Sequence, residues 1–108
     1  MHASTRSDPF PALADPTRRA ILDLLRVTET LTAGAIAAEF PALSRPAVSK
    51  HLAVLRDARL VRVRETGREW HYALDPEPLA DVYENWLGKF APLWDESLKR
   101  LKRKVEEG

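Results

Sequence analysis

Hydroxyl and basic side chains are concentrated in residues 44–51 of this 108-residue chain, which read Ser-Arg-Pro-Ala-Val-Ser-Lys-His. Ser44 followed by Pro46 is typical of a helix start, because serine caps the first turn and proline lacks an N–H that would be unpaired there. Arginine and lysine donate to guanine O6 and N7 or to phosphate oxygens, and small residues let the backbone approach base edges. We therefore expect DNA contacts from Ser44, Arg45, Pro46, Ala47, Ser49, Lys50 and His51.

An apolar face on the same segment determines which side of the helix is free. Val48, Leu52 and Leu55 recur at helical spacing and must face a core, so Arg45 and Lys50 lie toward the other side. The residue types leave open whether these two cations contact bases or phosphates. Ordinary exposed cations would show the same pattern, and only the hairpin expected downstream makes that explanation the weaker one.

Strict alternation after this helix predicts two strands joined at Gly67, which can adopt the positive φ of a tight turn. Val61 and Val63 point one way on the first strand, and the inward set expected on the second is Trp70, Tyr72 and Leu74. Three arginines lie on or near the projecting tip, where they could follow phosphates or enter the minor groove: Arg62, Arg64 and Arg68. Edge-strand charges that prevent aggregation are the alternative explanation.

Helix and hairpin together predict a winged helix, with residues 44–58 in the major groove and the 61–74 wing on the flanking backbone or minor groove. The charge distribution agrees. Residues 42–74 carry seven basic and three acidic side chains, although the whole chain has a net charge of only +1. A basic patch attracts the phosphate backbone through counterion release.

Two more helices are expected before this motif. Asp15 and Pro16 start one that ends near Arg26 or Val27, and Thr32 caps a shorter one through about Phe40. The length suits a single domain over residues 1–108. We expect a mostly α fold with a small β-hairpin (α+β), with a DNA-binding core at about 10–75 and a C-terminal helical dimerisation region at 76–107.

These motifs resemble the arsenical-repressor (ArsR) family of bacterial winged helix-turn-helix transcription factors. The resemblance rests on residues 14–22, 43–52, 60–61 and 67–69, and it covers about residues 10–80. It implies a dimer, formed by the first and last helices, that binds an imperfect palindrome near a promoter and usually represses transcription. Many members release DNA when a metal or another signal binds.

The metal-sensing part of the resemblance does not extend to this chain. Transition metals need thiolates or imidazoles converging on one point. The chain has no cysteine, and His2, His51 and His71 lack chelating spacing. We expect no metal and no other cofactor, which favours a non-metal-binding subset with a long aromatic tail.

Arg59 also departs from the family, which normally has glycine there. The position follows the recognition helix and often takes the left-handed conformation, so we expect a slightly strained or differently ended helix.

The tail carries more apolar surface than a domain of this size can cover alone. A second copy is the simplest partner, since two-fold dimers match palindromic sites with half-sites roughly 34 Å apart. Gly88 and Pro92 predict two helices, about 77–90 and 92–106. The residues expected to form the dimer interface are Leu79, Val82, Tyr83, Trp86, Phe90, Trp94, Leu98 and Leu101.

The tail aromatics also allow a pocket for an apolar small-molecule effector that shifts the dimer away from DNA. A dry dimer core explains the same spacing and is favoured.

Other functional classes are less well supported. The sequence has no phosphate-binding glycine loop or nucleophile elbow, so we expect no enzyme. No apolar run reaches the roughly 20 residues of a membrane span, and no signal peptide is evident, so we expect a cytoplasmic protein with no membrane partner. The remaining alternative is a winged-helix protein-interaction module that acts through its apolar tail without binding DNA.

Overall fold

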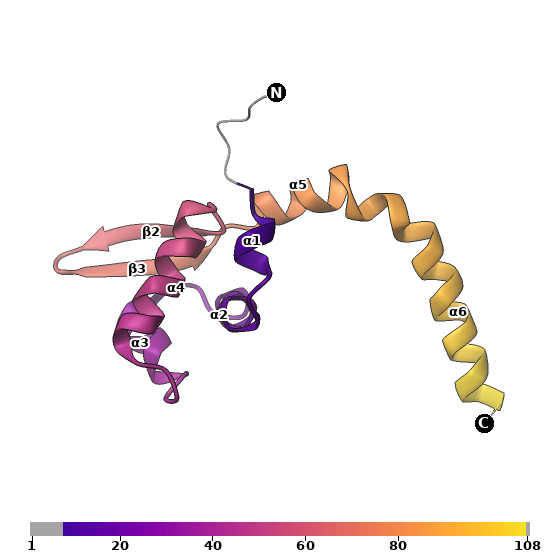
Figure 1. The fold of residues 1–108 in the computed structure, drawn as a ribbon, viewed down its shortest axis with the longest axis horizontal. Coiled ribbons are helices and arrows are strands. Elements are labelled where there is room, and N and C mark those ends of the chain that lie inside the picture. Colours follow the sequence, from indigo (N-terminus) through magenta and orange to yellow (C-terminus); the bar gives the residue numbers. More distant parts are fainter. Residues whose placement is uncertain (1–7, 108) are drawn as a thin grey trace. The chain divides into compact units, whose positions relative to one another are not determined.

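The computed structural model describes residues 8–107 of the chain. Figure 1 shows the order of its helices and strands. They are α1 (Phe10–Leu13), α2 (Pro16–Arg26), β1 (Leu31–Thr32), α3 (Ala33–Ala38), α4 (Arg45–Asp57), β2 (Val61–Thr66), β3 (Glu69–Leu74), α5 (Glu77–Asn85), the 3-10 turn η1 (Leu87–Phe90) and α6 (Ala91–Glu107). The chain divides into two compact units, residues 1–78 and 79–108.

Side-chain caps fix the starts of three helices in the first unit. The carboxylate of Asp15 accepts from the backbone N–H of Arg18 at 3.0 Å, and the Thr32 hydroxyl accepts from that of Ala35 at 3.1 Å. Ser44 caps α4 in the same way. All three predicted caps are therefore confirmed, although α3 ends at Ala38, short of the expected Phe40.

The core of the first unit lies where α2, α3 and α4 meet the sheet. The side chains that are buried with less than 2% exposure are those of Ile21, Leu25, Ile36, Val48, Leu52, Leu55 and Leu60. Val48, Leu52 and Leu55 thus face inward as predicted, and the opposite side of α4 stays exposed.

The sheet has three antiparallel strands in the order β1-β3-β2. The hairpin β2–β3 turns at Gly67, whose φ of 62° is left-handed, as the sequence predicts. β1 is an addition that the sequence did not suggest; its two residues pair with Tyr72 and His71 of β3.

Arg59 has a φ of 63°, the left-handed conformation expected at the end of the recognition helix. The N–H of Arg59 donates to the carbonyl of Arg56 at 2.9 Å, and that of Leu60 donates to Leu55 at 3.0 Å. These two bonds form a Schellman ending. The chain therefore turns from α4 into β2 through an arginine in a conformation that favours glycine.

The second unit consists of most of α5 followed by η1 and α6. The predicted pair of helices is confirmed, but the first ends at Asn85 rather than near residue 90. The chain breaks at Trp86, which has φ −141° and ψ −65°. Gly88 is needed for a close approach instead, since a Cβ there would lie 2.8 Å from the carbonyl oxygen of Tyr83. No helix among residues 8–107 is long and apolar enough to cross a membrane.

Candidate nucleic-acid interface

The exposed face of α4 carries the predicted base-contacting residues. The side chains of Ser49 and Lys50 are exposed, and Ala47 is half-buried beside them. Ser44 is exposed too, although its Oγ accepts from the N–H of Ala47 at 3.2 Å. A hydroxyl that accepts in this way can still donate its proton to an acceptor on DNA.

Arg45 is exposed at the first position of α4, next to the exposed Pro46. Its guanidinium lies over the start of α3, since a Cβ built on Gly34 would be 3.8 Å from Nη1. The Arg45 side chain thus lies near Gly34, between the two helices of the helix-turn-helix. A long flexible cation in that position can swing toward a phosphate without moving the backbone.

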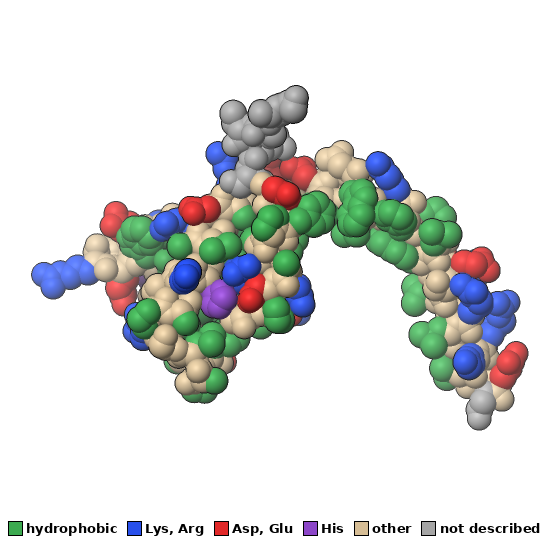
Figure 2. Space-filling model, in the orientation of Figure 1, with side chains coloured by type: hydrophobic (Ala, Val, Ile, Leu, Met, Phe, Trp, Pro, Cys, Tyr) green, Lys and Arg blue, Asp and Glu red, His purple; other side chains and the backbone are tan. Residues whose placement is uncertain are grey.

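The hairpin presents its three arginines to solvent. Arg62 and Arg64 lie on one face of β2, and Arg68 follows Gly67 at the tip, where a basic side chain projects in Figure 2. The Arg62 Nε lies 4.0 Å from the Asp75 carboxylate, at the limit of an ion pair. Arg64 and Arg68 are farther along the hairpin from that carboxylate.

The prediction that Trp70 faces the core is wrong. Tyr72 is 7% exposed as expected, but Trp70 is 41% exposed although both lie on the same face of β3. The hairpin projects beyond the helices at this point, so the inward face of its outer half has no core to cover it. Trp70 contacts Arg56 and Glu65 instead. Burial raises the pKa of Tyr72, and the nearby charge of Arg56 opposes this effect.

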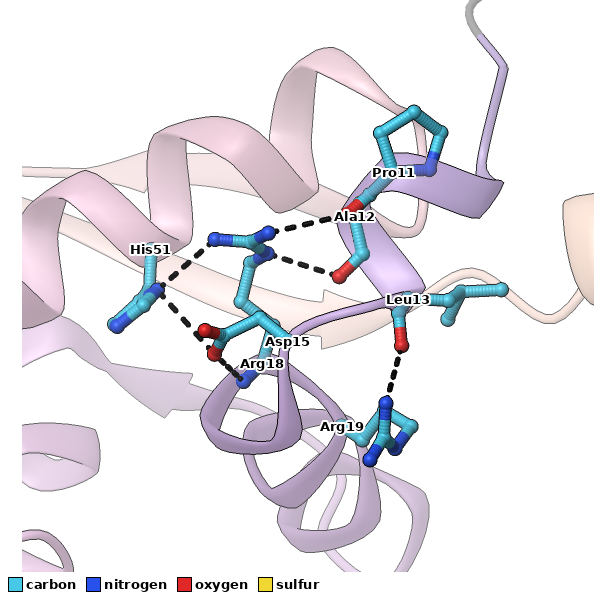
Figure 3. A network of polar contacts seen from close by, with 7 residues as sticks. All are labelled: Pro11, Ala12, Leu13, Asp15, Arg18, Arg19 and His51. Atoms are coloured by element: carbon cyan, nitrogen blue, oxygen red, sulfur yellow. Dashed lines mark hydrogen bonds and ion pairs between the residues drawn. The ribbon is translucent and has the colours of Figure 1, made fainter.

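His51 occupies the margin of α4, with 20% of its side chain exposed. It takes part in a polar network with α1 and α2 (Figure 3). Its Nδ1 lies 3.3 Å from Nη1 of Arg18 and 4.0 Å from Oδ2 of Asp15. The backbone N–H of Arg18 holds the pKa of Asp15 below its usual value, and the charge of the Arg18 guanidinium acts in the same direction.

Arg18 is the residue of this region for which the sequence pattern predicts no role. Asp15, Arg18 and Arg19 are recognisable as a helix start, but the contact between Arg18 and His51 spans 33 positions. No local spacing predicts such a contact.

The predicted dimerisation residues all belong to the tail. Leu79 and Val82 are half-buried; the exposed members are Tyr83, Trp86, Phe90, Trp94, Leu98 and Leu101. The rings of Tyr83 and Trp94 lie 6.2 Å apart, and those of Trp86 and Phe90 lie 5.4 Å apart. Along α6, hydrophobic side chains follow one side and charged side chains the other (Figure 2).

Within residues 8–107 the structure brings together no group of three or more histidine and carboxylate side chains that could hold a metal ion.

Comparison with known proteins places this geometry among transcriptional regulators. Residues 13–64 match a family described as a helix-turn-helix domain. The chain is 39% identical over 89 residues to the transcriptional repressor SdpR of Bacillus subtilis (strain 168), covering 82% of this chain and 96% of that protein. It is 52% identical over 71 residues to a helix-turn-helix-type transcriptional regulator of Mycobacterium tuberculosis, covering 66% of this chain and 64% of that one.

A solved structure gives the same result. The crystal structure of an ArsR family transcriptional regulator superposes with a TM-score of 0.67 and 37% identity, over 80% of this chain and 86% of that one.

Proposed function

Because the chain belongs to the ArsR family of winged helix-turn-helix, DNA-binding transcriptional regulators, we propose that it represses transcription as a homodimer on a palindromic operator. α4 enters the major groove and the β2–β3 wing lies on the flanking backbone or minor groove. The observation that carries this proposal is the exposed polar face of α4, opposite Val48, Leu52 and Leu55. That face stands on a buried core and is therefore rigid.

Residues 44–50 form the base-reading part of the proposed interface. The first turns of a recognition helix reach the groove floor, and Ala47 and Ser49 are small enough to let the α4 backbone approach it. Lys50 and Arg45 then donate to guanine edges or to the adjacent phosphates.

The wing arginines supply phosphate contacts or enter the minor groove. Arg64 and Arg68 are the main contributors, because Asp75 lies 4.0 Å from Arg62 and partly neutralises it. Each phosphate neutralised by arginine steepens the fall of affinity with salt by about 0.9 in logarithmic slope.

The tail supplies the dimer interface. Leu98, Leu101 and Val105 are 61%, 59% and 71% exposed along α6, and a surface of this kind requires a partner. A second copy of the chain meets that requirement and gives the two-fold symmetry of a palindrome. The ring pairs of Tyr83 with Trp94 and of Trp86 with Phe90 favour a packed interface over an effector pocket.

The proposal includes no cofactor and no catalytic activity, and it places the protein in the cytoplasm with its DNA. A protein-interaction role without DNA is the outcome that the experiment must exclude.

The experiment recovers genomic DNA fragments bound by the purified protein at near-physiological salt, where nonspecific attraction is weak and base contacts survive. We expect an inverted repeat upstream of particular genes. Lys50→Ala should lose the enrichment. Arg26→Ala is the matched control, because it removes an exposed cation from the end of α2, where it pairs with Asp23 at 3.7 Å. Recovery of the same fragments by Lys50→Ala, or no enrichment with the wild type, would contradict the proposal.

A further inference from the structure

Arg18 joins three helices through the nitrogens of one guanidinium (Figure 3). Its Nε donates to the Ala12 carbonyl at 2.9 Å and its Nη2 to the Pro11 carbonyl at 3.1 Å, both on α1. Its Nη1 lies 3.3 Å from Nδ1 of His51 on α4. The side chain starts on α2, so α1 and α4 are tied together through it.

The chemistry of this contact determines where the ring proton lies. A guanidinium carries donors only and stays protonated in proteins, so Nδ1 of His51 must be the acceptor. A neutral imidazole that accepts at Nδ1 carries its proton on Nε2. Asp15 does not compete for this position, since its Oδ2 is 4.0 Å from Nδ1, too long for a hydrogen bond, and already accepts from the backbone N–H of Arg18.

The Nε2–H group therefore remains as a donor, and Figure 3 shows that nitrogen pointing away from Arg18 and Asp15. His51 lies in the second turn of α4, between the buried Leu52 and the exposed Lys50. A side chain at the margin of a helix in the major groove meets the wall of the groove rather than its floor, and the walls are lined by phosphates.

We propose that Arg18 is a positioning residue for DNA binding: it fixes His51 in the Nε2–H form and aims that N–H at a phosphate oxygen. The proposal rests on the DNA-binding role of α4 given above. Because two carbonyls of α1 hold the guanidinium in place, the ring is ordered before DNA arrives and little rotamer freedom is lost on binding.

The first test measures the proton position in the free, full-length protein. Two-bond hydrogen–nitrogen correlation spectra of the histidine rings distinguish the Nε2–H form from the Nδ1–H and doubly protonated forms, and the His51→Gln variant identifies the His51 signals by their loss. We expect the Nε2–H form in the wild type and a mixture of forms in Arg18→Ala.

Arg19→Ala is the matched control, because Arg19 also reaches the end of α1, through the Leu13 carbonyl at 2.6 Å, but its bond does not include His51. It should leave the His51 spectrum unchanged. A wild-type ring protonated at Nδ1, and so paired with Asp15, would overturn the proposal.

The second test measures affinity for the recovered operator. His51→Ala should weaken binding about tenfold, as expected for one lost hydrogen bond to a charged group. His51→Gln should bind within a few-fold of the wild type, because the glutamine amide nitrogen can occupy the place of Nε2, whereas the shorter His51→Asn should not restore binding. Wild-type affinity in His51→Ala would overturn the inference while leaving the proposed function intact. If the wild-type protein enriched no operator from genomic DNA, the proposed function itself would be contradicted.

A double-mutant cycle tests the coupling. Arg18→Ala should weaken binding several-fold in the wild type but little in His51→Ala, whereas equal losses in both backgrounds would show that Arg18 acts only by supporting the fold. If Arg18→Ala is not folded at the temperature of the assay, Arg18→Lys takes its place in the cycle. Lysine keeps the positive charge and the aliphatic stem but cannot hydrogen-bond to all three acceptors at once.

Discussion

The guanidinium carbon of Arg56 lies 5.2 Å from the ring centre of Trp70, which joins the last turn of α4 to β3 of the wing. The indole Nε1 of Trp70 in turn donates to the Glu65 carboxylate at 3.0 Å, across the hairpin pair that these two residues form. The wing is thus held to the recognition helix by a side-chain contact outside the core. Because residues 64–70 of the hairpin are all exposed, we expect the orientation of its outer half to depend on this contact of Trp70.

Replacing Trp70 with leucine should therefore weaken operator binding several-fold while changing stability little. A cation–π contact at an exposed site is worth about 0.5–1 kcal/mol, so the melting temperature should fall by about 2–8 °C. The substitution removes no charged side chain. The affinity should fall because the wing arginines are no longer held in position beside α4. Affinity by fluorescence anisotropy and thermal unfolding measure the two effects. Trp70→Phe keeps a ring under Arg56 and should bind nearly normally; equal affinities for all three proteins would contradict this role.

Arg59→Gly should stabilise the protein. A non-glycine residue at a φ of 63° costs roughly 1 kcal/mol, and the Schellman bonds that end α4 are made by backbone atoms and remain. The melting temperature should rise by about 4–8 °C, the shift that 1 kcal/mol produces in a domain of 60–100 residues.

Gly67→Ala is the converse variant, since Gly67 has a φ of 62° and no heavy atom of the described residues lies within 4 Å of an added Cβ. It should be destabilised by strain alone. A lower melting temperature for Arg59→Gly would contradict the prediction.

The parts of this fold that could be predicted from the sequence are those with local causes. Asp15, Thr32 and Ser44 each bond an N–H three residues ahead, so each helix start is encoded within four positions. Periodicity likewise predicted the buried face of α4. Alternation predicted the correct face for Trp70 but could not show how far the core extends beneath it.

The features that could not be predicted depend on contacts between distant segments. β1 is two residues long, too short to show alternation, and exists because β3 offers it partners. The pairing of Arg18 with His51 has the same origin. In the tail, Gly88 and Pro92 predicted a break, but the chain turns at Trp86, and Gly88 is required because the Tyr83 carbonyl approaches it.

Acid should destabilise the first unit partly through Asp15. The pKa of this carboxyl is below its ordinary value of 3.8, chiefly because the backbone N–H of Arg18 binds the carboxylate. Between the two pKa values the unfolded chain binds more protons than the folded one, so the stabilisation is present above about pH 3.8 and is lost as the pH falls through the folded value. Urea unfolding at a series of pH values measures this effect. Asp15→Asn still caps α2 but does not ionise, so its stability should fall less steeply in acid; a parallel fall would contradict the assignment.

Leu98→Lys should dissociate the proposed dimer. Leu98 is 61% exposed on α6, and a charge there would be buried without a partner between two copies. Leu93 is the matched control: it is 64% exposed on the same helix but lies about 140° away around its axis at 100° per residue, so Leu93→Lys should remain dimeric. Sedimentation measures the oligomeric state.

Since the recognition helix is in the other unit, the Leu98→Lys monomer should still bind a single half-site as the wild type does. It should lose the 10²–10⁴-fold gain in affinity that linked binding to both halves of a palindrome provides. A Leu98→Lys protein that stays dimeric, or a Leu93→Lys protein that dissociates, would place the interface elsewhere.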